Sequence, residues 1–262
     1  MPSLSEHHSS KFVKMIYIGD SGTGKTGSLT SLVKAGYDLR ILDLDNGVDI
    51  LAKFVKKECP ERISSILYET RRDKYKITPG GAMVDGSPKA FVDAMGLLTK
   101  WSDGTIPAQW GERTIFVLDS LSALGKAAFE WAKGMNPTSK DPRQWYATGQ
   151  KALEDVLSNL TGESFATNVI IISHVQLQEL PDGSVKGYTN ALGKAMGATI
   201  PRYFNTLLLA ESTGSGENVR RNIRTVPTGM IDLKSSAPFK LDKSYPLGTG
   251  LATIFEKLKE ND

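Results

Sequence analysis

Two side chains suited to binding a phosphate and its metal ion, Lys25 and Thr26, close the sequence Gly-Asp-Ser-Gly-Thr-Gly-Lys-Thr at residues 19–26. This sequence fits the phosphate-loop pattern G-x-x-x-x-G-K-[ST] at every fixed position. A Cβ at Gly19 or Gly24 would block the approach of backbone N–H groups to phosphate oxygens. The lysine supplies a positive charge to the phosphates, and the threonine hydroxyl supplies a ligand to Mg²⁺. We therefore expect the nucleotide to contact Gly19, Asp20, Ser21, Gly22, Thr23, Gly24, Lys25, Thr26 and Gly27.

Two acidic residues follow other short apolar runs. Asp45 and Asp119 each come where a buried strand is expected to end. Open α/β sheets bind their ligands at the carboxyl ends of the strands. Asp119 has the place of a Walker B carboxylate, which emerges from its strand beside the phosphate loop to hold Mg²⁺. We expect Thr26 and Asp119 to bind the metal, and Lys25, Asp45 and Asp119 to act in catalysis.

His174 follows a third apolar run, at residues 168–172. One interpretation is a core histidine whose hydrogen bonds are satisfied inside the protein. The other places it at a strand end, where it would sense the terminal phosphate and act in catalysis, with Ser173 and Gln176 also within reach. Both interpretations remain open at this stage.

The elements that must position these residues alternate between strands and helices. Strands are expected at 14–18, 38–44, 114–118, 168–172 and 205–210, and helices at 25–34, 50–57, 88–101, 122–134, 143–160 and 251–259. This alternation, with the phosphate loop after the first strand, predicts a three-layer α/β fold with a mostly parallel sheet. A turn at 213–217 and a returning strand at 219–226 predict an antiparallel C-terminal hairpin extension. We expect a disordered tail at 1–10 and one domain over 11–262.

The length and composition are those of an ordinary globular domain. The chain has 262 residues, a net charge of +3 and one cysteine, Cys59. The length is sufficient for a full core without disulfides, and the small net charge does not by itself indicate a nucleic-acid binder. No stretch approaches the roughly 18 apolar residues of a membrane span. We expect a cytoplasmic protein without a membrane partner.

Two segments carry a family resemblance. Residues 41–49 resemble the RecA-family stretch that ends its strand in Asp-Ala-Glu, and residues 117–124 resemble the Walker B region of that family, where Asp-Ser is typical. Over residues 12–210 the chain looks like the compact phage RecA-like ATPases, AAA-type nucleotide-binding proteins that include single-strand annealing proteins. The resemblance implies a RecA-like P-loop NTPase fold, Mg²⁺-dependent ATP hydrolysis, a ring or filament of identical subunits, and the host cytoplasm if a phage encodes the chain.

The resemblance also assigns a role to Asp45, which falls at the position of the catalytic glutamate of the family. Aspartate is one methylene shorter, so its use as the base requires a shifted backbone. The family's DNA-binding loops correspond to residues 175–202, where no motif is present and the candidate DNA contacts are Lys186, Tyr188, Lys194 and Arg202. The basic run at 71–76 has two interpretations, a solvated loop or a surface that follows phosphates.

The resemblance implies an ATPase of DNA recombination or replication that binds single-stranded DNA and promotes annealing or strand pairing. The alternative is a nucleotide-dependent assembly or switch ATPase that acts on a protein partner. A small-molecule kinase is disfavoured because no Arg-rich lid is evident, although the basic run could serve as one. In ATPases that need a neighbouring subunit, a cation from that subunit reaches the phosphates. Arg220 and Arg224 share one face of the strand at 219–226, with Arg221 on the other, and the first two are the candidates for this role. Alternatively, all three arginines form a DNA-phosphate stripe or a solvated edge.

Overall fold

Most strands of the protein belong to one mixed sheet. The computed structural model describes residues 11–139 and 141–259, so the predicted tail at 1–10 lies outside the described residues. The eight strands are ordered β12-β11-β10-β1-β7-β6-β2-β3, and those from β10 to β3 run parallel. The antiparallel β11 and β12 confirm the predicted C-terminal extension. The strands are β1 (Lys14–Gly19), β2 (Asp38–Asp43), β3 (Ile66–Thr70), β6 (Gly111–Asp119), β7 (Thr167–Ser173), β10 (Thr206–Thr213), β11 (Arg220–Arg224) and β12 (Ser244–Pro246).

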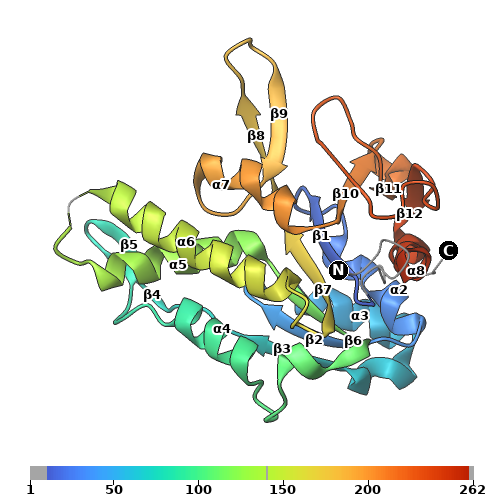
Figure 1. Cartoon of the computed structure of the whole chain (residues 1–262), viewed down its shortest axis with the longest axis horizontal. Coiled ribbons are helices and arrows are strands. Elements are labelled where there is room, and N and C mark those ends of the chain that lie inside the picture. The colour runs from blue at the N-terminus through green and yellow to red at the C-terminus, as the bar shows by residue number, and fades with distance from the viewer. Residues whose placement is uncertain (1–10, 140, 260–262) are drawn as a thin grey trace, which may run out of the picture.

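Helices cover both faces of the sheet and make the three layers that the sequence predicts (Figure 1). The α-helices are α1 (Lys25–Ser28), α2 (Thr30–Lys34), α3 (Val48–Glu58), α4 (Ala90–Thr99), α5 (Leu121–Met135), α6 (Pro142–Thr161), α7 (Gly193–Thr199) and α8 (Leu247–Lys259). The 3₁₀ turns are η2 (Pro60–Ser65), η3 (Pro107–Gln109), η4 (Ile200–Tyr203) and η5 (Gly216–Asn218). The helix predicted at 25–34 is interrupted at Leu29, which separates α1 from α2.

Each face of the sheet has its own hydrophobic core. Ile16 and Ile18 of β1 join a core with α4, α5 and α6, whereas Met15 and Tyr17 join the opposite core with α2, α3 and α8. This follows from the two-residue period of a strand, which points successive side chains to opposite faces. Because helices cover both faces, the parallel strands are apolar throughout rather than alternating. No helix in the described part of the chain is long and apolar enough to span a bilayer.

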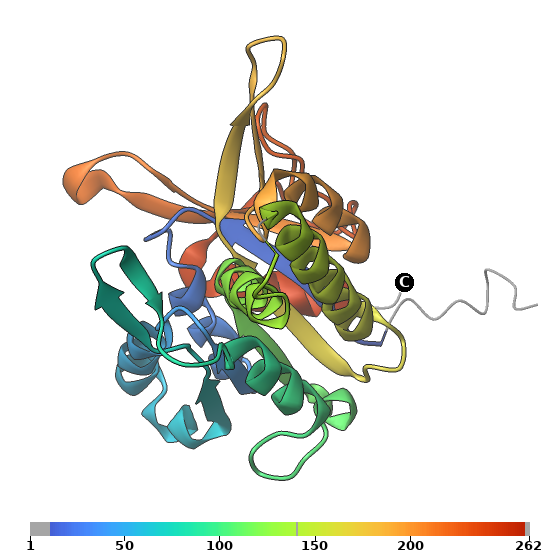
Figure 2. The same ribbon diagram turned by 90° about the vertical axis from the view of Figure 1, so that its left-hand side faces the viewer.

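Two hairpins lie outside the main sheet. One pairs β4 (Tyr75–Thr78) with β5 (Gly81–Val84), and the other pairs β8 (Val175–Glu179) with β9 (Val185–Thr189). The β8–β9 hairpin stands out from the body in both views, and β4–β5 lies beside α5 (Figures 1 and 2). The solvated-loop interpretation of the basic run at 71–76 is wrong at residues 75–76, where β4 begins and pairs with β5 across the turn at Pro79 and Gly80. β8 and β9 were not predicted either, because half of their residues are polar and only the turn between them was evident.

Candidate active site

The phosphate loop joins the end of β1 to the start of α1. Gly22 and Gly24 have φ of 78° and 92°, left-handed backbone that favours glycine. A Cβ on Gly19 would lie 2.5 Å from the carbonyl oxygen of Ala210 on β10, and one on Gly24 would lie 2.4 Å from the side chain of Leu247. The backbone of β10 therefore requires glycine at position 19 and the left-handed backbone requires it at position 24, in addition to the phosphate approach from which the sequence predicts them.

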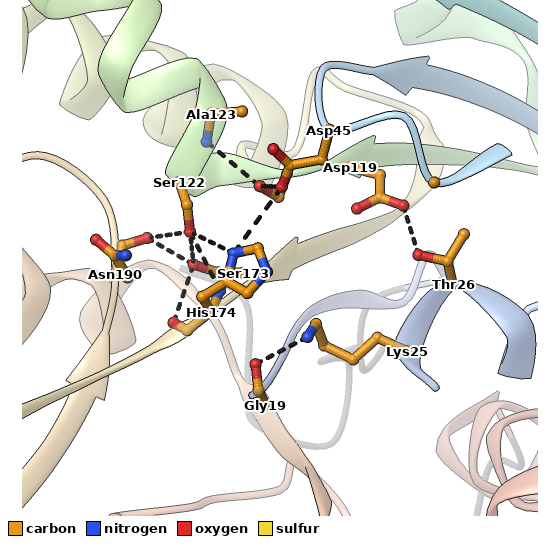
Figure 3. A network of polar contacts seen from close by, with 12 residues as sticks. Gly19, Lys25, Thr26, Asp45, Asp119, Ser122, Ala123, Ser173, His174 and Asn190 are labelled. Atoms are coloured by element: carbon orange, nitrogen blue, oxygen red, sulfur yellow. Dashed lines mark hydrogen bonds and ion pairs between the residues drawn. The ribbon is translucent and has the colours of Figure 1, made fainter. Parts of the chain in front are cut away.

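Lys25 reaches back across the loop (Figure 3). Its Nζ donates hydrogen bonds to the carbonyl oxygens of Gly19 at 2.8 Å and Asp20 at 2.9 Å. Burial lowers the pKa of Lys25, while the charges of Asp119, Asp20 and Asp45 act in the opposite direction. Three acidic side chains around one ammonium group, together with the backbone carbonyls, hold this cation at the mouth of the loop.

Thr26 and Asp119 meet where α1 faces the end of β6. The Thr26 hydroxyl donates to Asp119 Oδ2 at 2.7 Å. Burial raises the pKa of the Asp119 carboxyl to about 6; the hydrogen bond from Thr26 opposes this rise, and the neighbouring Asp43 and Asp45 add to it. A hydroxyl and a carboxylate are the oxygen ligands that Mg²⁺ prefers, so these two residues fit a magnesium site.

Gly47 lies directly against the side chains of Thr26 and Asp119. A Cβ at Gly47 would lie 2.6 Å from Asp119 Oδ2 and 3.0 Å from Thr26 Oγ1. The backbone there is ordinary right-handed helix, with φ of −81°. Close approach, and not backbone conformation, therefore requires glycine at this position, which the sequence did not single out.

The loop from β2 to α3 is organised by Asp43. This buried carboxylate accepts the backbone N–H groups of Asp45 at 3.2 Å and Gly47 at 3.1 Å, and its other oxygen accepts from Arg72 at 3.1 Å. The loop turns the Asp45 side chain towards the phosphate loop, where the Ser120 hydroxyl donates to it. The sequence missed Arg72 because nothing in the basic run shows which of its cations turns inward.

His174 lies next to Asp45 and belongs to a polar network at the base of the β8–β9 hairpin (Figure 3). Its Nδ1 is 3.9 Å from Asp45 Oδ2 and 3.3 Å from the Ser122 hydroxyl. Ser122 and Ser173 both donate to the carbonyl oxygen of Asn190, at 2.9 and 2.6 Å. The N–H of Asn190 donates to the carbonyl oxygen of His174 at 2.8 Å, which closes the hairpin where its two strands leave the body. Burial and the nearby Lys25 lower the pKa of His174.

These groups surround a cavity of about 610 Å³. This volume lies within the range of roughly 300–1,000 Å³ that is usual for ligand sites. Beyond the phosphate loop, the walls include apolar side chains that the sequence did not predict as part of the site, Ile50 and Phe54 of α3 and Leu247 of α8. Ile50 and Phe54 lie in the helix predicted at 50–57, whereas Leu247 precedes the helix predicted at 251–259, because α8 begins four residues earlier.

The predicted DNA contacts are not gathered at one point. Lys186 and Tyr188 lie on β9 of the projecting hairpin, and the Lys186 ammonium also pairs with Asp232 at 2.6 Å. Lys194 lies near the start of α7, where its carbonyl oxygen accepts from the β8–β9 hairpin. Arg202 lies further away on η4 and pairs with Glu154 of α6 at 3.1 Å. The structure thus brings the first three near the hairpin and places the fourth against α6.

The arginines of β11 divide between two faces. Arg224 is held by Glu211 of β10 through two hydrogen bonds at Nε and one at Nη2, the last at 2.9 Å. Arg220 is exposed near the turn. Arg221, on the opposite face, lines the cavity, and its Nε donates to the Gly22 carbonyl oxygen at 3.3 Å. The arginine nearest to the phosphate loop of its own chain is therefore the one that the sequence set apart from the two candidates.

Comparisons with known proteins identify the domain. The sequence matches the protein family described as an AAA domain over residues 11–237. A search of curated proteins found no match. The structure is similar to that of the RadB recombinase, with a TM-score of 0.50 and 14% identity over 91% of this chain and 89% of that chain. At this identity the likeness shows the fold alone.

Two archaeal proteins have lower scores. The KaiC-like protein of Pyrococcus horikoshii OT3 gives a TM-score of 0.45 with 12% identity, over 89% of this chain and 84% of that chain. The flagellar accessory protein FlaH of Methanocaldococcus jannaschii gives 0.43 with 13% identity, over 93% of this chain and 88% of that chain.

Proposed function

The chain belongs to the AAA-domain family and has a RecA-like P-loop ATPase fold, and on this premise we propose that it hydrolyses ATP, binds single-stranded DNA and promotes annealing or strand pairing. The observation that carries hydrolysis is the convergence of Lys25, Thr26, Asp45 and Asp119 on one cavity. Such a constellation positions a triphosphate and stabilises the charge that develops during phosphoryl transfer.

Each of these residues has a role that follows from its contacts. Lys25 would exchange its two carbonyl partners for phosphate oxygens. Thr26 and Asp119 would hold Mg²⁺, which would neutralise phosphate charge. Asp45 accepts a proton from the attacking water, while the Ser120 hydroxyl orients its carboxylate. His174, beside Asp45, contacts the terminal phosphate. Phe54 and Leu247 form the apolar walls for the base.

The β8–β9 hairpin supports the DNA part of the proposal. Its Lys186 ammonium lies 6.0 Å from the ring centroid of Tyr188, so a cation and a stacking surface are presented together. Single strands are bound by this combination of charge and aromatic stacking. Lys194 adds a positive charge near this hairpin. Arg202 contributes to DNA binding only when its ion pair with Glu154 breaks. The His174–Asn190 contact places the base of the hairpin beside Asp45.

One observation favours the alternative of a switch ATPase acting on a protein. Leu177 and Val185 on the same hairpin are 60% and 42% exposed. Exposed apolar side chains of this size suit a protein partner as well as a base.

Single-stranded DNA in an ATPase assay separates the candidates. We expect an oligonucleotide to raise the rate of the full chain and to bind with an affinity that falls as salt increases. Unchanged hydrolysis and no oligonucleotide binding would favour the protein-directed switch. Phosphate transfer to a small acceptor, rather than to water, would identify a kinase.

We further propose that residues 11–262 act as one domain in a cytoplasmic ring or filament. The exposed Arg220 is the arginine of the predicted pair that is free to reach a neighbouring subunit, because Arg224 is held by Glu211 in its own chain. A role for Arg224 at a neighbour's phosphates would require that ion pair to break.

A further inference from the structure

A second cavity, of about 410 Å³, shares Asp45 as a wall with the nucleotide cavity. Its other walls include Arg71, Arg72 and Tyr75 and, on α5, Lys126. We propose that this cleft binds one nucleotide unit of the DNA strand, with the phosphate at the cations and the base on Tyr75. The proposal rests on the DNA binding proposed above and adds a contact far from the β8–β9 hairpin in the sequence.

Three cations, Arg71, Arg72 and Lys126, line the cleft together with two carboxylates, Asp45 and Asp73. Arg71 pairs with Glu69 at 2.8 Å and Arg72 with Asp43 at 3.1 Å. Lys126 is exposed and, among residues 11–139 and 141–259, makes no ion pair. Its ammonium lies 4.8 Å from the ring centroid of Tyr75. Lys126 is therefore the cation of the cleft that no ion pair holds, and it stands next to an aromatic face.

The surroundings favour a strand over a small phosphate compound. Tyr75 is 44% exposed, and the β4–β5 hairpin continues outward from it with Ile77, 84% exposed, and Met83, 50% exposed. Exposed lysines at positions 74 and 89 lie in the segments that lead to and from this hairpin. Cations interleaved with stacking and apolar surfaces are typical of sites that follow a single-stranded backbone.

Arg72 connects the cleft to the catalytic loop. It bonds to one oxygen of Asp43, whose other oxygen holds the backbone N–H groups of Asp45 and Gly47. A phosphate in the cleft competes for the Arg72 guanidinium and so changes the support of this loop. Occupation of the cleft by DNA therefore alters the position of Asp45 and the rate of hydrolysis.

Binding of a fluorescent oligonucleotide to the full chain, with a non-hydrolysable ATP analogue over a salt series, tests the contacts. For Lys126→Ala we expect the slope of log K against log salt to become shallower by about 0.7, the value for one lost single-strand phosphate contact. For Tyr75→Ala we expect an affinity loss of at least about five-fold, whereas Tyr75→Phe keeps the affinity of the parent. Lys56→Ala, an exposed lysine of α3 outside both cavities, is the control, and this variant should keep the oligonucleotide affinity, the salt slope and the basal ATP hydrolysis of the parent.

The outcomes separate this inference from the proposed function. If the parent chain binds no oligonucleotide, both are overturned. If it binds and Lys126→Ala and Tyr75→Ala match it in affinity and salt slope, the cleft proposal is overturned and the proposed function stands. A third outcome is that deoxythymidine monophosphate binds saturably and Lys126→Ala abolishes this binding without affecting oligonucleotide binding. This outcome would also overturn the cleft proposal, in favour of a site for a small phosphate compound.

Arg72→Ala tests the coupling. We expect the ratio of oligonucleotide-stimulated to basal hydrolysis to fall towards one, at oligonucleotide concentrations that saturate the variant. A ratio equal to that of the parent would refute the link from the cleft to Asp45.

Discussion

Gly47→Ala tests the proposed metal site by the addition of one methyl group. The new Cβ would lie 2.6 Å from Asp119 Oδ2, so the two atoms must separate by about 0.8 Å to reach the 3.4 Å of an ordinary contact. The Thr26 hydroxyl, 3.0 Å from the same position, is also crowded. The helical backbone at Gly47 accepts alanine, so the effect arises from this contact and not from backbone strain.

The size of the effect follows from this displacement. A misplacement of about 1 Å in a catalytic group costs on the order of 10²-fold in rate. We expect kcat to fall by about this factor and the Mg²⁺ concentration for half-maximal activity to rise. Nucleotide affinity should change little, because neither Lys25 nor the backbone of the phosphate loop is touched. Overpacking of this kind costs about 1–3 kcal/mol of stability, so the variant should fold.

Steady-state ATP hydrolysis over a Mg²⁺ titration, with binding of a fluorescent ATP analogue and thermal unfolding, measures each of these quantities. Gly96→Ala on α4 is the matched control, because a Cβ there meets nothing within 4 Å. A folded Gly47→Ala protein with the parent kcat and the parent Mg²⁺ requirement would refute the assignment of Thr26 and Asp119 to the metal.

The remaining predictions concern the nucleotide site and Arg220. Lys25→Ala removes the main countercharge of the phosphates, so the protein should fold and lose turnover; hydrolysis at the parent rate would contradict the nucleotide site. Asp45→Asn should keep nucleotide affinity and lose at least ~10²-fold in rate, and equal losses of binding and rate would instead indicate a structural role. Because burial holds the pKa of Asp119 near 6, its proton competes with Mg²⁺ below that pH, and the Mg²⁺ requirement should rise as pH falls from 7 to 5. The same raised pKa means that the metal-free folded state binds this proton more tightly than the unfolded state, so the proton's contribution to stability is fully present below the ordinary value of 3.8 and is lost as pH rises through about 6. If Arg220 acts on the site of a neighbouring subunit, a mixture of Arg220→Ala and Lys25→Ala subunits should recover part of the ATPase rate, because some interfaces then pair an intact Arg220 with an intact Lys25. A mixture without any recovery would refute this role of Arg220.

The parts of the site that lie in one segment were predictable from the sequence. The phosphate loop is contiguous, so its residue types and spacing define its geometry. Asp45, Asp119 and His174 were predictable as neighbours because parallel strands bring their carboxyl ends to one edge of a sheet. Asp43 and Asp119 indeed occupy paired positions on β2 and β6.

Residues that reach the site through tertiary packing were not predictable in this way. Phe54 lies in a predicted helix and Leu247 precedes one, and only the packing of α3 and α8 on either side of the phosphate loop makes these residues cavity walls. Arg72 stands among several cations in the sequence, and its role depends on the buried oxygen of Asp43. Such contacts are set by where whole elements pack, which a local pattern does not encode.

The arginines of β11 show most clearly what the period-two alternation of a strand does not predict. Period-two alternation separates Arg221 from Arg220 and Arg224, but it does not say which face of the strand meets the phosphate loop. That choice is made by Ile223, which is buried and packs with α8 in the core on one side of the sheet. Arg221 shares the face of Ile223 and so lies over Gly22, while Arg224 points the other way and pairs with Glu211. Arg221 is therefore the arginine that contacts the phosphate loop of its own chain, and the test of the proposed contact between subunits falls on Arg220.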